Sequence, residues 1–440
     1  MSTKTQSMPR LIQAMKDAFS LPDLRNKILF TLGMLIIFRL VAHVPMPGVN
    51  TGALATLFEN VPLLGMLDLF SGGALRNFSV AAMGVYPYIT ATIIMTVLVP
   101  VIPKLQAISM EGESGRNKIS LISHWLTVPI GALSAYGQIT FMKSQGVLAW
   151  DIPALTMVTM IISMIAGTMF LIWLGELITS HGIGNGISII IFSGIVAGYP
   201  QGVGQAALLS ATNMAGVIFF FIILLATVVL IVYFTEAHRR IPVQYAKSVF
   251  RGGRMYKQSG ATHIPIRVNT AGMIPLIFAM SLAMFPGIIA TYFMSPEGAA
   301  PNFANTIYNW FNPSMQLPIG LFYWGLFFLL TVGFAFFYTY IIFQQQDLPG
   351  NLQKQGGFIP GIRPGGQTKK YLDGVIGHIT WGGALFLGLV GVIPFLAFIV
   401  TTVDLPFSSM GLIIVVGVVL DTMKQLEAQL VMRRYEGFIK

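Results

Sequence analysis

Residues 213–235 read NMAGVIFFFIILLATVVLIVYFT, a run without a charged side chain. A helix needs about 20 mostly apolar residues to cross the hydrocarbon core of a bilayer. The whole chain has the same character, because 55% of its 440 residues are hydrophobic and only 10% are charged. Soluble domains carry about 25% charged residues. The composition therefore excludes an ordinary soluble enzyme, a disordered scaffold and, with no cysteine present, a disulfide-stapled secreted module.

Nine further stretches have the length and composition of membrane spans. The ten predicted spans are 27–44, 77–99, 119–141, 153–175, 183–199, 213–235, 271–293, 318–343, 375–398 and 407–425. Residues 1–26 carry charges but have neither an apolar core nor a small-residue cleavage site. We interpret them as an amphipathic segment on the membrane surface and not as a cleavable signal peptide. The predicted fold class is an all-α polytopic membrane protein.

The positive charges are distributed unevenly between the two sides of these spans. With the N-terminus placed in the cytoplasm, 23 of the 26 Lys and Arg residues fall on the cytoplasmic side, and only Arg76 and Lys143 fall outside. This asymmetry predicts that both the N-terminus and the basic tail 426–440 are cytoplasmic. Arg39 lies near the end of the first span. We expect it to reach outward or, more often for such a residue, to serve helix packing.

Two of the predicted cytoplasmic loops are strongly basic. Segment 236–270 holds seven cations against the single acid Glu236, and segment 344–374 holds four cations among glycines and prolines. The cations are Arg239, Arg240, Lys247, Arg251, Arg254, Lys257, Arg267, Lys354, Arg363, Lys369 and Lys370. They either only satisfy the orientation rule or belong to protruding loops that dock an anionic partner, such as ribosomal RNA or an acidic protein surface.

Ten spans divide into two halves of five, 27–199 and 213–425, and an odd number of spans per half inverts the second half. The second span of each half contains the pattern G-x-x-P-x-I, at residues 84–89 and 272–277. Because proline removes a backbone hydrogen bond inside a helix, we expect Pro87 and Pro275 to bend these spans. The bends are either harmless kinks or hinges on either side of a transport pathway.

Ionisable groups and enzyme motifs are missing where a carrier or an enzyme would need them. No Asp or Glu lies near the middle of a predicted span, which argues against an ion-coupled carrier. The six histidines are dispersed, so we expect no metal site, no cofactor and no catalytic residue. Residues 182–186, GIGNG, lack the lysine of a phosphate loop and are interpreted as a tight turn. A secondary transporter remains the alternative; an intramembrane enzyme lacks a catalytic pair.

Residues 61–75, VPLLGMLDLFSGGAL, are apolar yet too short to cross a membrane. They directly precede the second span on the predicted outer side. Ser71, Gly72 and Gly73 supply a flexible joint. The segment is either a helix lying on the membrane surface or a mobile stopper folded back into a pore.

Several long motifs resemble the SecY family, the channel-forming subunits of the bacterial protein translocase, over essentially the whole chain. The motifs are FSGGAL (70–75), EGESGR (111–116), GTMFLIWLGELIT (167–179), GIGNGISIIIF (182–192), MIPLIFA (273–279), FFYT (336–339) and GGFIPGIRPG (356–365). The resemblance implies a clamshell of two inverted five-helix halves around an hourglass pore. The segment QQQDLPG (344–350) departs from the more acidic beginning that is usual in that loop.

The resemblance also implies site residues. The aliphatic ring that closes the pore falls on Val85, Ile89, Ile187, Ile191, Ile277 and Ile414. The plug falls on 63–74 and includes Leu64, Met66, Leu67, Phe70, Ser71, Gly72 and Gly73. The lateral gate, between spans two/three and seven/eight, includes Pro87, Thr90, Thr92, Asn269 and Pro275. The docking charges are Arg239, Arg240, Lys247, Arg251, Arg254, Lys257 and Arg363.

A member of this family would conduct unfolded secretory polypeptides across the bacterial cytoplasmic membrane and release transmembrane helices sideways into the lipid bilayer. The resemblance implies SecE-like and SecG-like small membrane subunits, a SecA-like motor ATPase or a ribosome as the source of energy, and signal-sequence-bearing polypeptides as substrates. A ring without charge can gate by dewetting and accept any polypeptide sequence. A signal sequence would favour the open state through its contacts with the gate.

Overall fold

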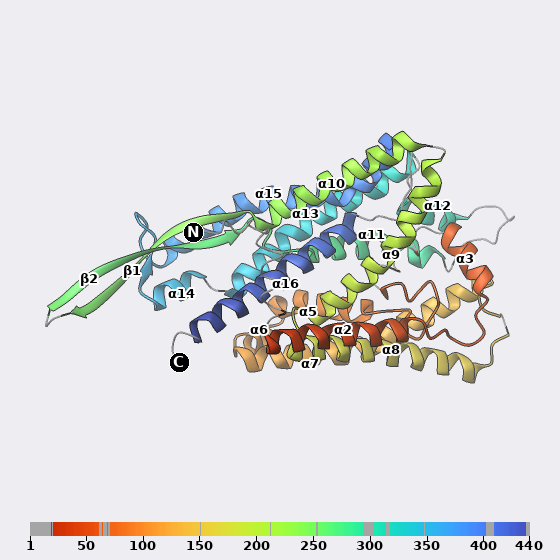
Figure 1. Ribbon diagram of the computed structural model, residues 1–440, viewed down its shortest axis with the longest axis horizontal. Helices are drawn as coiled ribbons and strands as arrows, with labels where there is room; N and C mark the ends of the chain where they lie inside the picture. The colour runs from red at the N-terminus through yellow and green to blue at the C-terminus, as the bar shows by residue number, and fades with distance from the viewer. Residues whose placement is uncertain are drawn as a thin grey trace, which may run out of the picture. The chain divides into compact units, whose positions relative to one another are not determined.

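The computed structural model (Figure 1) shows a largely helical chain. It describes residues 19, 21–60, 64, 68, 71–149, 151–211, 213–251, 254–291, 293, 302–313, 317–346, 348–401 and 409–436. Two compact units follow from the internal contacts. Unit 1 comprises Met1–Leu208, Leu405–Phe407 and Ile414–Lys440, and unit 2 comprises Leu209–Asp404 and Ser408–Ile413. The amphipathic surface segment predicted at residues 1–26 lies mostly outside the described residues.

Unit 1 is built from helices. They are α2 (Pro22–Ala42), α3 (Thr51–Asn60), α5 (Tyr86–Val101), α6 (Pro103–Ser109), α7 (Glu113–Ser144), α8 (Ala154–His181), α9 (Gly186–Ser210) and most of α16 (Ser409–Glu436). Unit 2 combines helices with one sheet. Its elements are α10 (Met214–Glu236), β1 (His238–Arg251), β2 (Arg254–Arg267), α11 (Ile274–Thr291), α12 (Phe303–Phe311), α13 (Ile319–Gln346), α14 (Leu348–Lys354), β3 (Gly357–Phe358) and α15 (Gly366–Thr401).

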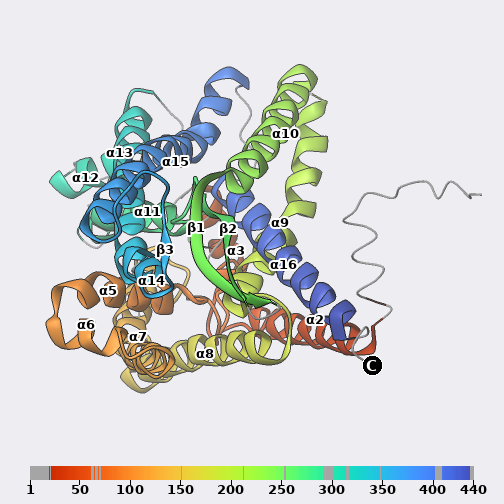
Figure 2. The same ribbon diagram turned by 90° about the vertical axis from the view of Figure 1, so that its left-hand side faces the viewer.

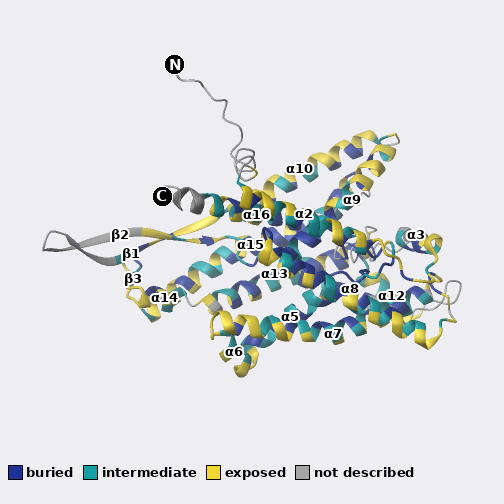
Figure 3. Ribbon diagram, turned by 60° about the horizontal axis from the view of Figure 1, so that its bottom comes forward, coloured by how far each residue is buried: buried dark blue, intermediate teal, exposed yellow. Residues whose placement is uncertain are grey.

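A helix lies at each of the ten predicted spans: α2, α5, α7, α8, α9, α10, α11, α13, α15 and α16. Among the described residues, six helices are long and apolar enough to cross a membrane, and α5 with α6, which bend by 104° between them, make a possible seventh. The outer surfaces of these helices are apolar. For example, α10 exposes Ile222, Leu225 and Val229 (Figure 3). A helix that is apolar all round suits lipid and not water.

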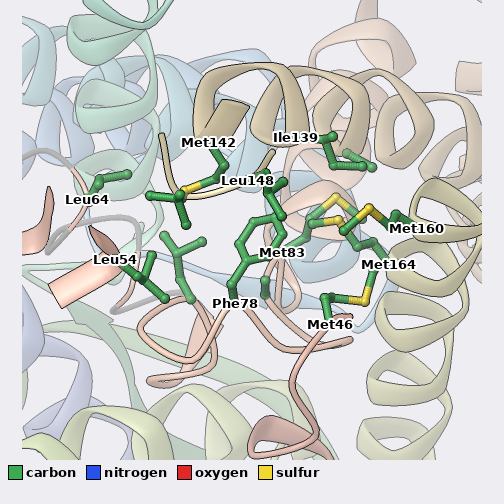
Figure 4. Close-up of a cluster of buried hydrophobic side chains, with 14 of the residues drawn as sticks. Met46, Leu54, Leu64, Phe78, Met83, Ile139, Met142, Leu148, Met160 and Met164 are labelled. Carbon is green, nitrogen blue, oxygen red and sulfur yellow. The ribbon is translucent and has the colours of Figure 1, made fainter. Parts of the chain in front are cut away.

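The main core of unit 1 lies where α3, α7 and α8 meet the loops around them. Figure 4 shows Phe78 among Leu54, Met83 and Leu148, and all four side chains are buried. Methionines fill much of the remaining space, and their flexible side chains suit an irregular gap. This core fixes residues 71–85, the stretch that leads from the apolar 61–75 segment to α5.

The last helix packs differently from the predicted halves. We assigned 407–425 to the second half, but residues from Ile414 onward belong to unit 1 by their contacts. Leu426 of α16 packs with Leu24 and Ile183 in a small buried cluster. The apolar stripe that continues beyond the predicted span explains the difference, because it gives α16 a face that packs against the start of α2.

The basic loops contain a sheet that the sequence analysis did not predict. The strand order is β2-β1-β3, and all neighbours are antiparallel. Strands β1 and β2 pair over 14 residues each, so the hairpin extends about 45 Å. Figure 2 shows β3 and α14 beside the hairpin. Because β3 belongs to 344–374, the two predicted basic loops form one structure.

Candidate functional site

The G-x-x-P-x-I pattern has the same local structure in both units. Gly84 and Gly272 adopt positive φ angles of 54° and 65°. Two residues after each glycine a helix begins, and Pro87 and Pro275 are the second residues of α5 and α11. Glycine adopts this backbone conformation without strain, and proline suits the first turn of a helix, where its missing N–H has no partner to lose.

The prediction that these prolines bend their spans is therefore wrong. Pro87 and Pro275 begin helices and break no internal hydrogen bond. Span two begins at Tyr86 and not at residue 77, because residues 75–85 form a series of turns before the helix. The repeated pattern marks the point at which an irregular link joins a helix.

A second structural feature occurs in both units. A Cβ atom added at Gly167 of α8 would lie 2.2 Å from the carbonyl oxygen of Val80, and one added at Gly383 of α15 would lie 2.4 Å from that of Val268. Val80 and Val268 each lie four residues before the glycine of the repeated pattern. Helices α8 and α15 are the fourth predicted spans of their halves. Each link thus packs on a glycine of the corresponding helix, as expected for an internal structural repeat.

The predicted ring residues are buried or half-buried. Val85, Ile191, Ile277 and Ile414 are buried, whereas Ile89 and Ile187 are intermediate. The amide of Ile89 donates to the carbonyl of Val85 at 3.0 Å, which confirms the helical i, i+4 relation. Five of the residues belong to unit 1 and Ile277 belongs to unit 2. The ring that combines them stays a prediction.

The predicted polar gate residues on α5 satisfy their own hydrogen bonds. Thr90 Oγ1 donates to the carbonyl of Tyr86 at 3.1 Å, and Thr92 Oγ1 donates to that of Ile89 at 2.8 Å. Hydroxyls bonded in this way are inexpensive to place in an apolar surrounding. Asn269 lies in the link before α11, with its Cα 3.7 Å from the Cβ position of Gly383. Their role at a gate stays a prediction.

The predicted plug is described in part. Leu64 is buried in the main core of unit 1, and Ser71 and Gly72 are buried while Gly73 is partly exposed. The predicted plug residues Met66, Leu67 and Phe70 lie outside the described residues. The described residues from 64 to 74 other than Gly73 are buried, which favours the stopper over a helix lying on the membrane surface.

Asp68 organises the end of this segment. Its Oδ1 atom accepts hydrogen bonds from Ser71 Oγ at 3.0 Å, from the amide of Leu75 at 3.1 Å and from the amide of Arg76 at 3.2 Å. Its Oδ2 atom pairs with Arg76 Nε at 3.0 Å. Arg76 Nη1 continues to Gln201 Oε1 of α9 at 2.7 Å. One carboxyl group therefore closes the loop and ties it to α9.

Burial raises the pKa of the Asp68 carboxyl above its ordinary value, although Arg76, Ser71 and the backbone donors act in the opposite direction. The side chain is only 8% exposed, whereas that of Arg76 is 45% exposed. The ion pair is thus half solvated and contributes little. The acceptor atoms of Asp68, and not its charge, are what the loop requires.

Arg39 contacts the same loop from α2. Its Nη1 atom donates to the carbonyl oxygen of Gly72 at 2.8 Å, and it lies 3.6 Å from the Cβ position of Gly73. The expectation that Arg39 serves helix packing did not include this contact. Its guanidinium binds the plug segment.

Gly72 fits tightly between α2 and α9. A Cβ atom at Gly72 would lie 2.6 Å from Cζ of Phe38, and one at Gly194 would lie 2.1 Å from the Cα of Gly72. The φ angles of Gly72 and Gly73 are 69° and 83°. Glycine is required here for the backbone conformation and for the close approach of two backbones.

The turn at 182–186 is confirmed as a tight connection, and its amides have partners within the chain. The amide of Ile183 donates to Thr31 Oγ1, that of Gly184 to Gln425 Oε1, and that of Gly186 to Thr179 Oγ1. A phosphate loop needs free amides. This turn instead joins α2, α8, α9 and α16.

The basic sheet presents its charges to solvent. In the described parts of segments 236–270 and 344–374, the cations at exposed positions are Arg239, Arg240, Arg267, Lys354, Arg363, Lys369 and Lys370. For Lys247, Arg251, Arg254 and Lys257 the structure gives the strand position only. The underside of the sheet is apolar, with Ile241, Val243 and Ile266 buried against Leu352 and Ile359. The charged loops therefore have a folded core that fixes them as one surface.

Sequence reasoning missed the anchors of the plug. Asp68 is the only acid within the apolar stretch 61–75, and Arg76 is the first residue after that stretch. An acid in an apolar segment needs a partner, so this pair was detectable. The Gly72–Gly194 contact was not, because it joins residues far apart in the chain. Within the described residues no group of His, Asp and Glu could hold a metal ion.

Helices at the ten predicted spans, a local pattern repeated in both units, a short apolar segment held inside one unit and a basic sheet in the other indicate the class of membrane transport proteins. The SecY family model matches residues 79–423. The protein translocase subunit SecY of Streptomyces scabiei is 39% identical over 449 aligned residues, which cover 98% of this chain and all of the relative. The chain belongs to the SecY family.

Solved structures share the fold. A SecY channel whose plug domain stabilises the closed state and maintains a membrane seal has a TM-score of 0.62 and 18% identity, with 92% of each chain covered. Sec61 in the canine ribosome–channel complex has a TM-score of 0.63 and 18% identity, again with 92% of each chain covered. The multi-pass helical class predicted from the sequence is thereby confirmed.

Proposed function

We propose that this chain is the pore-forming subunit of a protein-conducting channel, which passes unfolded secretory polypeptides across a bacterial cytoplasmic membrane and releases apolar helices sideways. The observation that carries the proposal is the seated segment around Gly72. It is too short to span, yet α2, α9 and its own Asp68 hold it inside unit 1. Family membership supports the same function.

Closure rests on two elements in series. The six ring residues carry only aliphatic side chains, and a narrow aliphatic constriction excludes ions by dewetting while it places no hydrogen-bonding requirement on the passing polypeptide. The plug covers the ring from the outer side and moves away during transport. Both elements lack a specific ligand, which suits a substrate of any sequence.

Lateral release uses the helices that follow the repeated pattern. Helices α5 and α11 each follow an irregular link and have a proline in their first turn, so each helix can move as a rigid body about that link. A signal sequence that binds between spans two/three and seven/eight shifts the population toward the open gate, through contacts that only the open state offers. Pro87, Thr90, Thr92, Asn269 and Pro275 belong to this gate.

Energy comes from partners, because the chain carries no nucleotide-binding motif. The basic sheet docks a SecA-like motor or a ribosome, as the ribosome complex of the structurally similar Sec61 supports. Small SecE-like and SecG-like subunits complete the channel. Both chain termini are cytoplasmic, since that orientation places 23 of 26 Lys and Arg residues inside.

Reconstitution tests the function. Vesicles that contain the chain with its small subunits should take up an unfolded secretory precursor only when the motor and ATP are present. Deletion of residues 63–74 should raise ion leak across a planar bilayer. Uptake of a small solute in place of the precursor would instead indicate a secondary transporter, and an unchanged conductance after the deletion would rule out the stopper.

A further inference from the structure

Arg39 is a cation in the apolar helix α2, and its position demands an explanation. Arginine within a membrane span is costly and usually has a specific partner. On one side Arg39 borders a hollow of about 550 Å³ whose other lining residues are Leu32, Leu35, Ile36, Leu40 and His43. On the other side it meets the plug segment.

The plug supplies the acceptor that the hollow lacks. Within the described part of the chain, the Gly72 carbonyl, 2.8 Å from Nη1, is the acceptor in hydrogen-bond range of this guanidinium. A hydrogen bond from a charged donor is stronger than a neutral one. The seated plug therefore offsets part of the cost of placing arginine in α2.

We propose that Arg39 is the positioning residue that holds the plug seated, through its hydrogen bond to the Gly72 carbonyl. The inference rests on the proposed function, in which residues 63–74 act as a stopper. Displacement of the plug breaks this bond and leaves the guanidinium without its acceptor. Arg39 therefore sets the ratio of seated to displaced plug and returns the segment to one position, because the acceptor is a single backbone oxygen.

A cysteine reporter can measure seating independently of ion flow. The natural chain has no cysteine, and Ala74, the last residue of the plug, has an exposed fraction of 0%. In the full chain with A74C, reconstituted in vesicles, the rate of labelling by a water-soluble maleimide reports the displaced fraction. The variants to compare are Arg39→Met, Arg39→Lys and, as the loss of another outer-side cation, Lys143→Met, which has no hydrogen bond to the described residues of the plug.

Arg39→Met should raise the labelling rate about tenfold or more, the effect expected for a hydrogen bond to a charged group. Arg39→Lys keeps a charged donor and should restore most of the protection, and Lys143→Met should label like the parent. If Arg39→Met does not accumulate, Arg39→Leu, which also lacks a donor, takes its place. Unchanged labelling in Arg39→Met, or equal labelling in Arg39→Lys and Arg39→Met, would overturn the proposal.

The deletion of 63–74 separates this inference from the proposed function. If the deletion raises ion leak and Arg39→Met changes neither leak nor labelling, the stopper stands and the role of Arg39 is refuted. If the deletion leaves leak unchanged, the stopper fails. The labelling rates alone then decide whether Arg39 seats the segment.

Discussion

Gly194→Ala gives the sharpest perturbation of the seated plug. The new methyl carbon would lie 2.1 Å from the Cα of Gly72, whereas carbon atoms pack at about 3.5–4.0 Å. The backbone at Gly72 must therefore move by about 1.4 Å or more. The 2.8 Å bond between Arg39 and the Gly72 carbonyl does not survive such a shift unless Arg39 follows. The lost bond costs about 1.5–3 kcal/mol.

That cost corresponds to a shift of about ten- to hundredfold toward the displaced plug. The macroscopic ion leak and the rate of A74C labelling should both increase by this order, because both follow the fraction of channels with a displaced plug. Gly198→Ala is the matched control, since it lies one turn further along α9 and a Cβ atom there has no neighbour within 4 Å. If Gly194→Ala and Gly198→Ala give the same leak and the same labelling, the steric account of seating is wrong.

Three other predictions follow from the same structure. Asp68→Ala should unseat the plug, because it removes the acceptor of the Arg76 amide, at about 1–3 kcal/mol. It also removes one of the two acceptors of the Ser71 hydroxyl and of the Leu75 amide. Asp68→Asn should seat normally, and acidification should not raise leak, since the seated carboxyl has the higher pKa. Gly383→Ala should lower the melting temperature of the purified protein through its clash with the link before α11, whereas Gly382→Ala, with open space around its Cβ position, should not. Charge reversal on the basic sheet should weaken binding of the motor or ribosome in a sedimentation assay, and equal affinity would mean that these charges only orient the chain. The residues to reverse are Arg251, Arg254 and Arg363.

The helices were predictable because membrane crossing imposes a length and a composition on each of them. All ten predicted spans contain a helix, and α10 matches its predicted bounds within a residue at each end. The beginnings of α5 and α11 were harder to predict. A proline in an apolar run indicates either a kink or a helix start, and only the positive φ of the preceding glycine distinguishes the two.

Contacts between distant residues were beyond the sequence. Charged residues in β1 obscure its alternation of apolar and polar side chains, and β3 has only two residues. The sequence therefore shows no periodic pattern that would predict the sheet. Arg39 binds a backbone carbonyl, which every residue type has, so the identity of residue 72 does not indicate this contact. By contrast, the turn at 182–186 was predicted correctly, because glycine spacing depends on local backbone geometry.

In the proposed channel, unfolded polypeptide passes through the ring of aliphatic side chains predicted from the sequence. A cysteine at Ile89 of α5 and another at Ile277 of α11, each in an otherwise cysteine-free chain, should crosslink to a precursor that is stalled halfway by a folded domain. Cysteines at the lipid-exposed residues Leu225 and Val229 of α10 serve as controls. Crosslinks at 89 and 277 with none at 225 and 229 are the predicted result, and crosslinks confined to 225 and 229 would contradict the account.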